Sequence, residues 1–260
     1  MHIDTIYDTI HRYKYISIAY STYNKAYMIE VHNLSHRFTT RQWALRECSF
    51  SLEQGDFLFL TGSSGAGKST LLKLLYGELP VLSGHVLVDK FQLEHIRGNQ
   101  IPLLRQEVSF VFQDFKVLPE WTVFDNIAIA LRIRGFSKEQ IERRTKAVAK
   151  ALGLEKKIYD CCSNISGGEQ QRVAIARAIV PNPKVILADE PTGNLDPTLS
   201  LRLMDIFMQF KGRGTTVIFA THNLELLQKY QNTKRIHLEH GTIVSANWNG
   251  ASIYKERQIV

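Results

Sequence analysis

The chain has 260 residues, of which 44% are hydrophobic and 22% are charged, and its formal net charge at pH 7 is +7. These values are typical of a soluble globular protein with one large or two small domains. The sequence contains no run of about 18 apolar residues, which argues against a membrane-spanning helix, and its charged start is not that of a secretory signal.

The three cysteines, two of which are adjacent, fit neither a disulfide framework nor a zinc site, so reduced cytosolic thiols are expected. The positive charge indicates an acidic partner, for which a nucleotide, a nucleic acid and an anionic membrane face all qualify. For the one modest basic cluster we favour a solvated helix face over a surface that lies against the inner leaflet of a membrane. The cluster contains Arg132, Arg134, Lys138, Arg143, Arg144 and Lys146.

The first 27 residues are rich in tyrosine and show no clear period. We interpret 1–27 as an N-terminal extension of unknown role, or as the product of a mis-assigned start before Met28. Strands are expected from Met28 to Val31 and from Trp43 to Leu52, with Phe38 in the loop before the second strand.

A buried strand from Phe57 to Leu60 leads into a glycine-rich loop and then into a helix from Ser69 to Tyr76, which Gly77 and Pro80 end. Farther along, apolar runs bounded by turn residues predict more strands, with helical patterns between them. The expected strands are 86–88, 108–112, 185–188 and 216–220, and the expected helices are 123–134, 138–152, 169–180, 197–210 and 224–230.

This alternation predicts an α/β fold with a mainly parallel sheet, whose ligands bind at the carboxyl ends of the strands. The two consecutive helices between 122 and 152 indicate a small helical subdomain beside this core. The residues suited to chemistry lie at the ends of the expected strands, and this coincidence does not depend on any one motif. They belong to Thr61 and Gly62, to Gln113, to Asp189 and Glu190, and to His222.

The glycine-rich loop fits the phosphate-binding pattern G-x-x-x-x-G-K-[ST] with Gly62, Gly67, Lys68 and Ser69. Glycines allow backbone torsions that place several N–H groups around a phosphate chain, and the start of the following helix adds a favourable dipole. Lys68 can reach the β- and γ-phosphates, and the Ser69 hydroxyl can ligate Mg²⁺. The loop therefore predicts nucleotide binding.

Two carboxylates end the apolar strand at 185–188. Asp189 has the place of a residue that holds the Mg²⁺ shell beside Ser69, and Glu190 could accept a proton from an attacking water. Gln113 offers an amide oxygen to the same ion. His222 is either a satisfied structural histidine or, in the context of a nucleotide site, part of that site.

Residues 29 to about 244 resemble the ATP-binding cassette (ABC) ATPases over nearly their whole length. Residues 62–69 match the Walker A loop, Gln113 the Q-loop, 165–171 the family signature, 185–190 the Walker B strand, 194–196 the D-loop and His222 the switch histidine. The signature departs from the usual L-S-G-G-Q at Ile165 and Glu169, which is tolerable because its Ser and Gly residues carry the phosphate contacts. Phe38 stands where an aromatic residue, commonly Tyr, stacks on adenine.

This resemblance implies a P-loop NTPase core with a mainly parallel sheet, an antiparallel β subdomain and a helical subdomain inserted at about 114–170. The ATPase domain would span 28–250, and a C-terminal tail would span 251–260. ATP and Mg²⁺ are the implied cofactors, with Ser69, Gln113 and Asp189 as the metal ligands. The implied nucleotide-binding residues are Phe38, Gly62, Ser63, Ser64, Gly65, Ala66, Gly67, Lys68, Ser69, Thr70, Gln113, Ser166, Gly167, Gly168, Glu169 and Asp196.

The resemblance also implies a mechanism in which two chains form a head-to-tail homodimer. The Walker A loop of one chain and the signature of its partner enclose each ATP. Glu190 is then the general base, His222 holds the γ-phosphate and the water, and Lys68 contacts the phosphates. Asp196 couples the two sites, and hydrolysis opens the dimer.

Several segments, among them 59–62, 112–115 and 188–196, resemble the cell-division branch of the family. This resemblance is closer than that to the lipoprotein-releasing and macrolide-exporting ATPases, which share the block 189–196. This implies a location on the cytoplasmic face of the inner membrane. It also implies a membrane partner, together with which ATP-driven motion activates peptidoglycan hydrolases. We expect the partner to dock near Phe115, Leu118, Pro119 and Trp121, for which the core of the helical subdomain is the alternative place.

Three other functions stay open. A lipoprotein-releasing or exporting ATPase would have a different membrane partner. A DNA-structure ATPase carries a long coiled coil between the Q-loop and the signature, but only about fifty residues separate Gln113 from Ser166 and no sustained heptads occur, so no nucleic-acid partner is expected. An ATP-gated scaffold with little turnover is the third.

Overall fold

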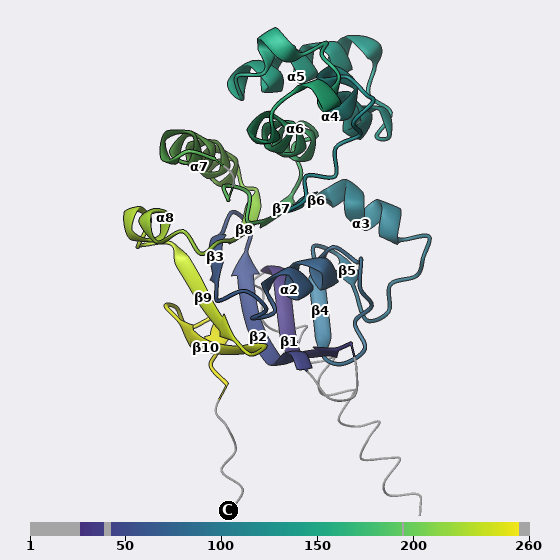
Figure 1. Ribbon diagram of the computed structural model, residues 1–260. Coiled ribbons are helices and arrows are strands. Elements are labelled where there is room, and N and C mark those ends of the chain that lie inside the picture. Colours follow the sequence, from purple (N-terminus) through teal and green to yellow (C-terminus); the bar gives the residue numbers. More distant parts are fainter. Residues whose placement is uncertain (1–26, 39–42, 194, 255–260) are drawn as a thin grey trace, which may run out of the picture.

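Two sheets and a group of helices make up the computed structural model, which describes residues 27–38, 43–193 and 195–254 (Figure 1). Of the predicted extension at 1–27, Tyr27 alone is described, and it begins the first strand. The larger sheet has the strand order β10-β9-β3-β8-β7-β6, and the smaller sheet has the order β11-β2-β1-β4-β5.

The larger sheet is parallel from β9 to β6, and β10 joins its edge antiparallel. Every residue of β3, β7 and β8 is buried, which is why these strands stand out in the sequence as unbroken apolar runs. The sheet confirms the predicted fold class. Its strands are β3 (Phe57–Thr61), β6 (Val108–Val111), β7 (Val185–Asp189), β8 (Thr216–Ala220), β9 (Lys234–Glu239) and β10 (Thr242–Ala246).

The smaller sheet is antiparallel and forms the expected β subdomain. Its first strand runs well past the predicted end at Val31, because a register shift with Asn33 at φ 48° interrupts the alternation of apolar residues. β11 pairs with β2, so this sheet reaches two residues into the segment predicted as a tail. The strands are β1 (Tyr27–Arg37), β2 (Trp43–Glu53), β4 (His85–Val88), β5 (Phe91–Gln92) and β11 (Ala251–Ser252).

The helices form a layer between the sheets, a layer on the far face of the larger sheet, and a separate group above it (Figure 1). In the separate group, Thr122 and Ser137 cap α4 and α5 as predicted. The α-helices are α2 (Lys68–Leu75), α3 (Ile101–Glu107), α4 (Val123–Arg132), α5 (Lys138–Ala151), α6 (Gly167–Ile179), α7 (Pro197–Gly212) and α8 (Leu224–Lys229), and the 3₁₀ turns are η1 (Glu155–Lys157) and η2 (Cys162–Asn164).

Alternate side chains of β3 enter two separate cores. Leu58 and Leu60 pack with the smaller sheet and α2, whereas Phe57 and Phe59 pack with α7 and the other helices on the far face. The ring of Phe219 on β8 lies 5.8 Å from that of Phe59, in an edge-to-face arrangement. Both faces of the sheet are therefore covered, and the ends of its strands provide the open edge.

Candidate active site

A cleft of about 700 Å³ opens at the carboxyl ends of β3 and β7. Its lining comes from segments that lie far apart in the sequence, so the fold brings together most of the residues that the sequence places at strand ends. Among the lining residues are Phe38, Gly62, Ser63, Ser64, Gly65, Ala66, Gly67, Lys68, Ser69, Thr70, Gln113, Asp189, Glu190 and His222.

Two glycines let the loop after β3 pass close to other backbone segments. Gly67 has a φ of 107°, and a Cβ atom there would come within 2.5 Å of the Ala44 carbonyl oxygen. A Cβ atom on Gly62 would overlap the Leu238 carbonyl oxygen in the same way. Any side chain at either position would displace backbone, so the shape of the loop depends on glycine there.

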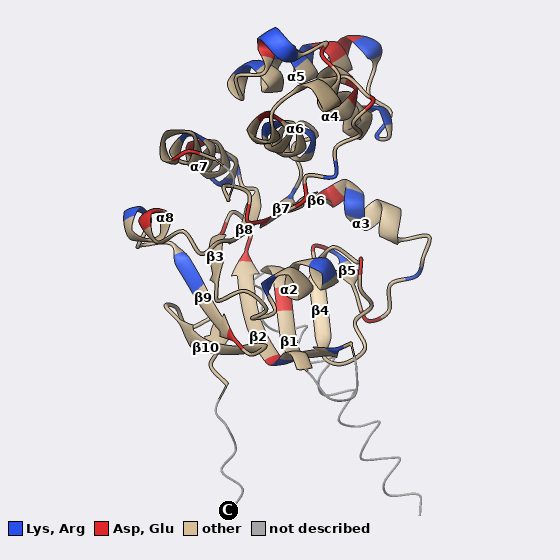
Figure 2. Ribbon diagram, in the orientation of Figure 1, with Lys and Arg blue, Asp and Glu red and all other residues tan. Residues whose placement is uncertain are grey.

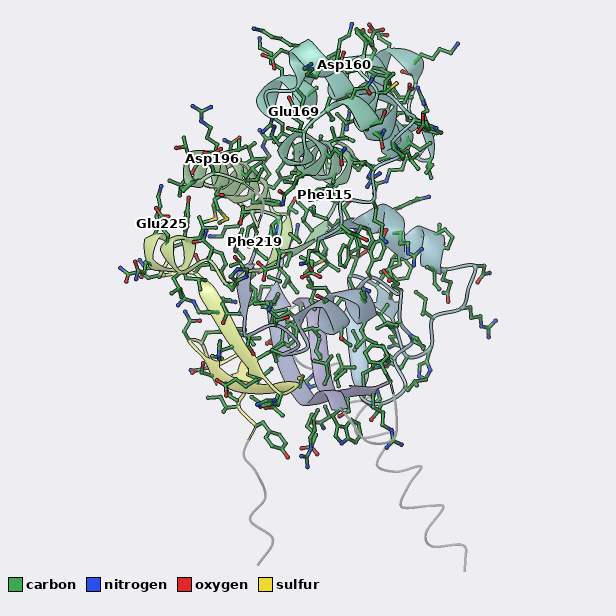
Figure 3. All side chains as sticks on the ribbon, in the orientation of Figure 1. Phe115, Asp160, Glu169, Asp196, Phe219 and Glu225 are labelled. Atoms are coloured by element: carbon green, nitrogen blue, oxygen red, sulfur yellow. The ribbon has the colours of Figure 1, made fainter. Side chains whose placement is uncertain are left out.

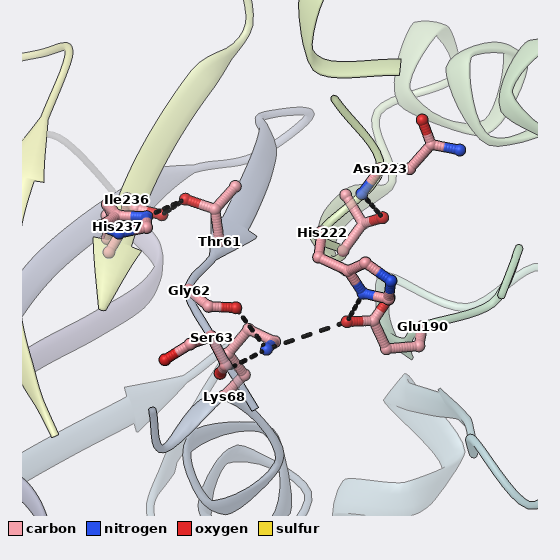
Figure 4. A network of polar contacts seen from close by, with 10 residues as sticks. Thr61, Gly62, Ser63, Lys68, Glu190, His222, Asn223, Ile236 and His237 are labelled. Carbon is pink, nitrogen blue, oxygen red and sulfur yellow. Dashed lines mark hydrogen bonds and ion pairs between the residues drawn. The ribbon is translucent and has the colours of Figure 1, made fainter. Parts of the chain in front are cut away.

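The ammonium group of Lys68 lies inside this loop (Figure 4). Its Nζ donates hydrogen bonds to the carbonyl oxygens of Gly62 at 2.8 Å and Ser63 at 3.1 Å. The side chain is buried, and Nζ lies 3.8 Å from Oε1 of Glu190. The loop thus holds one positive charge at the floor of the cleft, where a phosphate chain needs it.

Glu190 and His222 form a pair across the cleft from Lys68 (Figure 4). Nδ1 of His222 lies 2.9 Å from Oε1 of Glu190. Because a carboxylate oxygen accepts hydrogen bonds, Nδ1 is the donor in this contact. The pair is held by a backbone in the left-handed region, since Glu190 has a φ of 48°.

Asp189 has the environment expected of a cation ligand. Its side chain is buried at the end of β7, and burial raises the pKa of the carboxyl, which a hydrogen bond from Ser69 partly offsets. Its Oδ1 atom has no hydrogen-bond partner within the described part of the chain. Together with the Ser69 hydroxyl and the Gln113 amide at the same cleft, this makes a set of oxygen donors that fits Mg²⁺.

The residues of the signature do not line this cleft. They begin α6, in the helical group, where Figure 3 labels Glu169. Ser166 and Glu169 form a capping box: the Ser166 N–H and hydroxyl each donate to Glu169 Oε2 at 2.8 Å, and the Glu169 N–H donates back to Ser166 Oγ at 3.3 Å. These bonds lower the pKa of the Glu169 carboxyl.

Two further predicted nucleotide contacts lie at the periphery. Asp196 caps α7 by accepting a hydrogen bond from the Leu199 N–H at 2.9 Å, and it does not line the cleft. Phe38 borders the cleft with 65% of its surface exposed, and its ring meets that of His36 edge to face at 5.0 Å. Within the D-loop, Asn194 lies outside the described residues.

The predicted docking residues lie in the loop that follows Gln113 and leads from β6 to α4. Leu118 and Trp121 are 40% and 39% exposed, and Pro119 is exposed too, so these three are not core of the helical subdomain. The buried Asn126 side chain holds the loop by accepting from the Leu118 N–H at 2.8 Å and donating to the Leu118 and Trp121 carbonyls. Phe115 is half-buried.

The basic cluster has partners of its own. Figure 2 shows both signs of charge on α5. Lys146 pairs with Glu142 at 2.7 Å, and the Arg144 guanidinium lies over the Phe136 ring at 4.6 Å. Such i, i+4 pairing is what a solvated helix face carries, which supports that interpretation over a membrane-facing one.

Two cleft residues were not predicted from the sequence. Trp43 and Ala44, at the start of β2, line the cleft beside Phe38. The Arg37 guanidinium lies 5.3 Å from the centre of the Trp43 ring. An exposed tryptophan at the start of a strand was the available signal, because it adds a second aromatic surface where a base could stack.

Residues 45–193, more than half of the chain, match the ABC transporter family. The chain belongs to this family. Membership of the ABC family confirms the resemblance seen in the motifs, and it makes the protein an ATPase of the cassette type, with ATP as its ligand. Among the described helices, none combines the length and the apolar character that crossing a bilayer requires.

Several relatives in this ABC family are cell-division ATP-binding proteins named FtsE. The protein from Streptococcus pneumoniae D39 is 41% identical over 88% of this chain and 99% of its own length. The Bacillus subtilis protein is 42% identical over 84% of this chain and 95% of its own, and the Escherichia coli K12 protein is 42% identical over 78% and 91%. The chain is therefore FtsE-like across nearly the full length of these relatives.

Two solved structures of an ABC cassette, MJ0796, have the same fold, with TM-scores of 0.79 over 85% of this chain and 98% of theirs. Their sequences are 28% and 29% identical to this one. Both structures are dimeric, and one is a post-hydrolysis state bound to ADP and Pi.

Proposed function

We propose that this chain is the ATP-hydrolysing subunit of a cell-division membrane complex, and that it works with a membrane protein of the FtsX type. ATP-driven closing and opening of its homodimer transmits motion across the inner membrane to activate peptidoglycan hydrolases. The observation that carries this proposal is the 41–42% identity to FtsE proteins over 90–99% of their length.

The arrangement of the cleft supports hydrolysis of a triphosphate. Glu190 is the general base that takes a proton from the attacking water, and its partner His222 lies 2.9 Å away, where it can hold the water and the γ-phosphate. Lys68 neutralises phosphate charge from the floor of the cleft. Ser69, Gln113 and Asp189 would hold Mg²⁺, which neutralises charge on the β- and γ-phosphate oxygens when bound.

A second chain completes the site. The N–H groups at the start of α6, with Ser166, Gly167 and Gly168, form a phosphate-binding helix start that its own cleft does not include. In a head-to-tail dimer, this helix start contacts the ATP of the partner subunit. Asp196 then lies at the interface and couples the two sites. The dimeric state of the MJ0796 cassettes supports this arrangement.

Phe115, Leu118, Pro119 and Trp121 form the surface on which the membrane partner docks. Three of these side chains are exposed, and Asn126 fixes the backbone that presents Leu118 and Trp121. A rigid, partly apolar surface favours binding because little conformational entropy is lost on contact. Docking on such a partner would hold the protein at the cytoplasmic face of the inner membrane, which is the location that we propose.

The test is co-purification with an FtsX-type protein from membranes, using Trp121→Glu and a matched variant. Leu224→Glu introduces the same charge at an exposed apolar residue of α8, and Figure 1 shows α8 well apart from α4, the helix that follows Trp121. We expect Trp121→Glu to lose the partner while it keeps ATP binding, and Leu224→Glu to keep both. Recruitment of Trp121→Glu at the normal level would mean that the docking surface is elsewhere.

The alternative, a transporter ATPase for lipoproteins or exported drugs, has weaker support. The cassette described as that of a bacterial ABC transporter is 29% identical, against 41–42% for the FtsE proteins. Co-purification with a transporter subunit in place of an FtsX-type protein would favour the alternative. A steady-state ATPase rate near zero for the whole complex would favour the third possibility, an ATP-gated scaffold with little turnover.

A further inference from the structure

The side chain of Gln171 is buried between the signature helix and the turn that carries Glu190. It belongs to the second turn of α6 and is 2% exposed. Ala174 and Ile175, three and four residues on, are buried on the same helix face. A polar residue on such a face is costly unless it has a partner, so its contacts need to be explained.

The side-chain amide of Gln171 donates to the carbonyl oxygens of two consecutive residues, Glu190 and Pro191. Its Nε2 lies 2.5 Å from the Pro191 carbonyl oxygen and 3.5 Å from that of Glu190. The helix that begins with the signature is thereby joined to the turn that follows β7. Both acceptors are main-chain oxygens, so these bonds restrain the backbone of the turn and do not occupy the Glu190 carboxylate.

The backbone of this turn is strained. Glu190 has a φ of 48° and precedes Pro191, and a residue before proline strongly prefers extended backbone. Such a backbone conformation is unfavourable by itself and persists only where the surrounding contacts impose it. Two backbone bonds contribute, from the Glu190 N–H to the Ala220 oxygen and from the Gly193 N–H to the Glu190 oxygen, both at 3.1 Å.

We propose that Gln171 is a positioning residue for the general base: its amide holds the turn at 190–191 so that the Glu190 carboxylate meets His222. This inference rests on the proposed role of Glu190. α6 would then have two roles. Its N-terminus contacts the nucleotide of the partner subunit, and Gln171 in its second turn positions the general base of its own subunit.

Gln171→Leu tests this proposal, since it keeps a similar volume and removes the donor. We expect kcat for ATP to fall roughly 10- to 100-fold, because small misplacements of a catalytic group have effects of that size, while KM stays within about twofold. In the Glu190→Gln background, Gln171→Leu should leave the ATP-dependent dimer intact. A general structural defect would instead weaken the dimer.

Two further variants keep the result decisive. Gln209→Leu makes the same change at an exposed position of α7 and should leave kcat unchanged. Gln171→Glu keeps the size and shape of the side chain but sets an acceptor against two carbonyl oxygens, and it should lower kcat even if the leucine variant folds poorly. Normal kcat in either folded Gln171 variant, or loss of the dimer together with kcat, would overturn the proposal. Neither result affects the proposed function, which fails instead if Glu190→Gln alone keeps its turnover.

Discussion

Nδ1 of His222 and Oε1 of Glu190 lie 2.9 Å apart, and Nζ of Lys68 lies 3.8 Å from the same oxygen. The proposed base, the proposed γ-phosphate contact and the phosphate-binding cation thus form one connected cluster. A triphosphate entering the cleft would compete with Glu190 for the Lys68 ammonium and for the His222 ring N–H. The cluster therefore links nucleotide binding to release of the carboxylate for proton transfer.

Lys68→Ala should reduce ATP affinity by about 10- to 100-fold, because one charge-assisted hydrogen bond to phosphate contributes roughly 1.5–3 kcal/mol. Isothermal titration with ATP measures the change. Lys73→Ala, on the same helix, removes an ammonium whose side chain is 40% exposed and pairs with Glu78, and it should bind ATP normally. Unchanged affinity in Lys68→Ala would count against the phosphate loop.

Gly67→Ala and Gly65→Ala should differ in their effect on the loop. Both glycines have positive φ, so alanine costs on the order of 1–2 kcal/mol at either position. Gly65 has open space around it, whereas a Cβ atom on Gly67 would lie 2.5 Å from the Ala44 oxygen. Gly67→Ala should therefore destabilise the fold and weaken ATP binding more than Gly65→Ala does, as thermal melting and titration would show. Equal effects would contradict the packing described for this loop.

Glu169 stands where the usual signature has glutamine, and its hydrogen bonds predict how substitutions there affect the dimer. Its carboxylate accepts from the Ser166 N–H and hydroxyl and so caps α6. Glu169→Gln keeps an acceptor oxygen and should retain ATP-dependent dimerisation. Glu169→Ala removes the half of the capping box that the Glu169 side chain supplies but leaves Ser166 as the N-cap. The loss of these hydrogen bonds should cost about 1 kcal/mol and weaken the dimer several-fold. Sedimentation of both variants in the Glu190→Gln background decides this, and indistinguishable variants would exclude a capping role.

The buried carboxyl group of Asp189 should lower the stability of the folded protein at neutral pH. Burial raises the pKa of its carboxyl above that of the unfolded chain, so the folded state loses stability as the pH rises through this window and the group ionises. Asp189→Asn should therefore melt at a higher temperature than the parent protein at pH 7 without ligands. The difference should shrink as the pH falls below the ordinary pKa of aspartate. A parent protein that is more stable at pH 7 would show that the carboxylate is well compensated.

The sequence predicted the parts of the site that follow buried strands. β3, β7 and β8 are apolar throughout, and their ends deliver the phosphate loop, Asp189 with Glu190, and His222. Weakly patterned elements were missed. α3 has a proline near its start and one buried residue, Leu104, while β5 and β11 have two residues each and therefore no period.

Contacts between distant segments could not be predicted from the sequence either. The amide of Gln171 contacts the carbonyl of Pro191, and that of Asn126 contacts the carbonyl of Leu118, through bonds to backbone oxygens that no residue pattern records. Trp43 joins the cleft because β2 pairs with β1 in a register that sets it opposite Arg37. Each of these depends on packing that the chain acquires only in the folded state.

In the proposed mechanism, one ATP is held between two copies of this chain, with Glu190 as the base. Glu190→Gln removes the base and keeps the shape of the side chain, so hydrolysis should stop while ATP still binds. The decisive measurement is the molar mass of this variant in solution with saturating ATP and Mg²⁺. We expect a stable dimer, which reverts to monomers when ATP is removed. A monomer under these conditions, both for the isolated protein and in complex with its membrane partner, would contradict this mechanism.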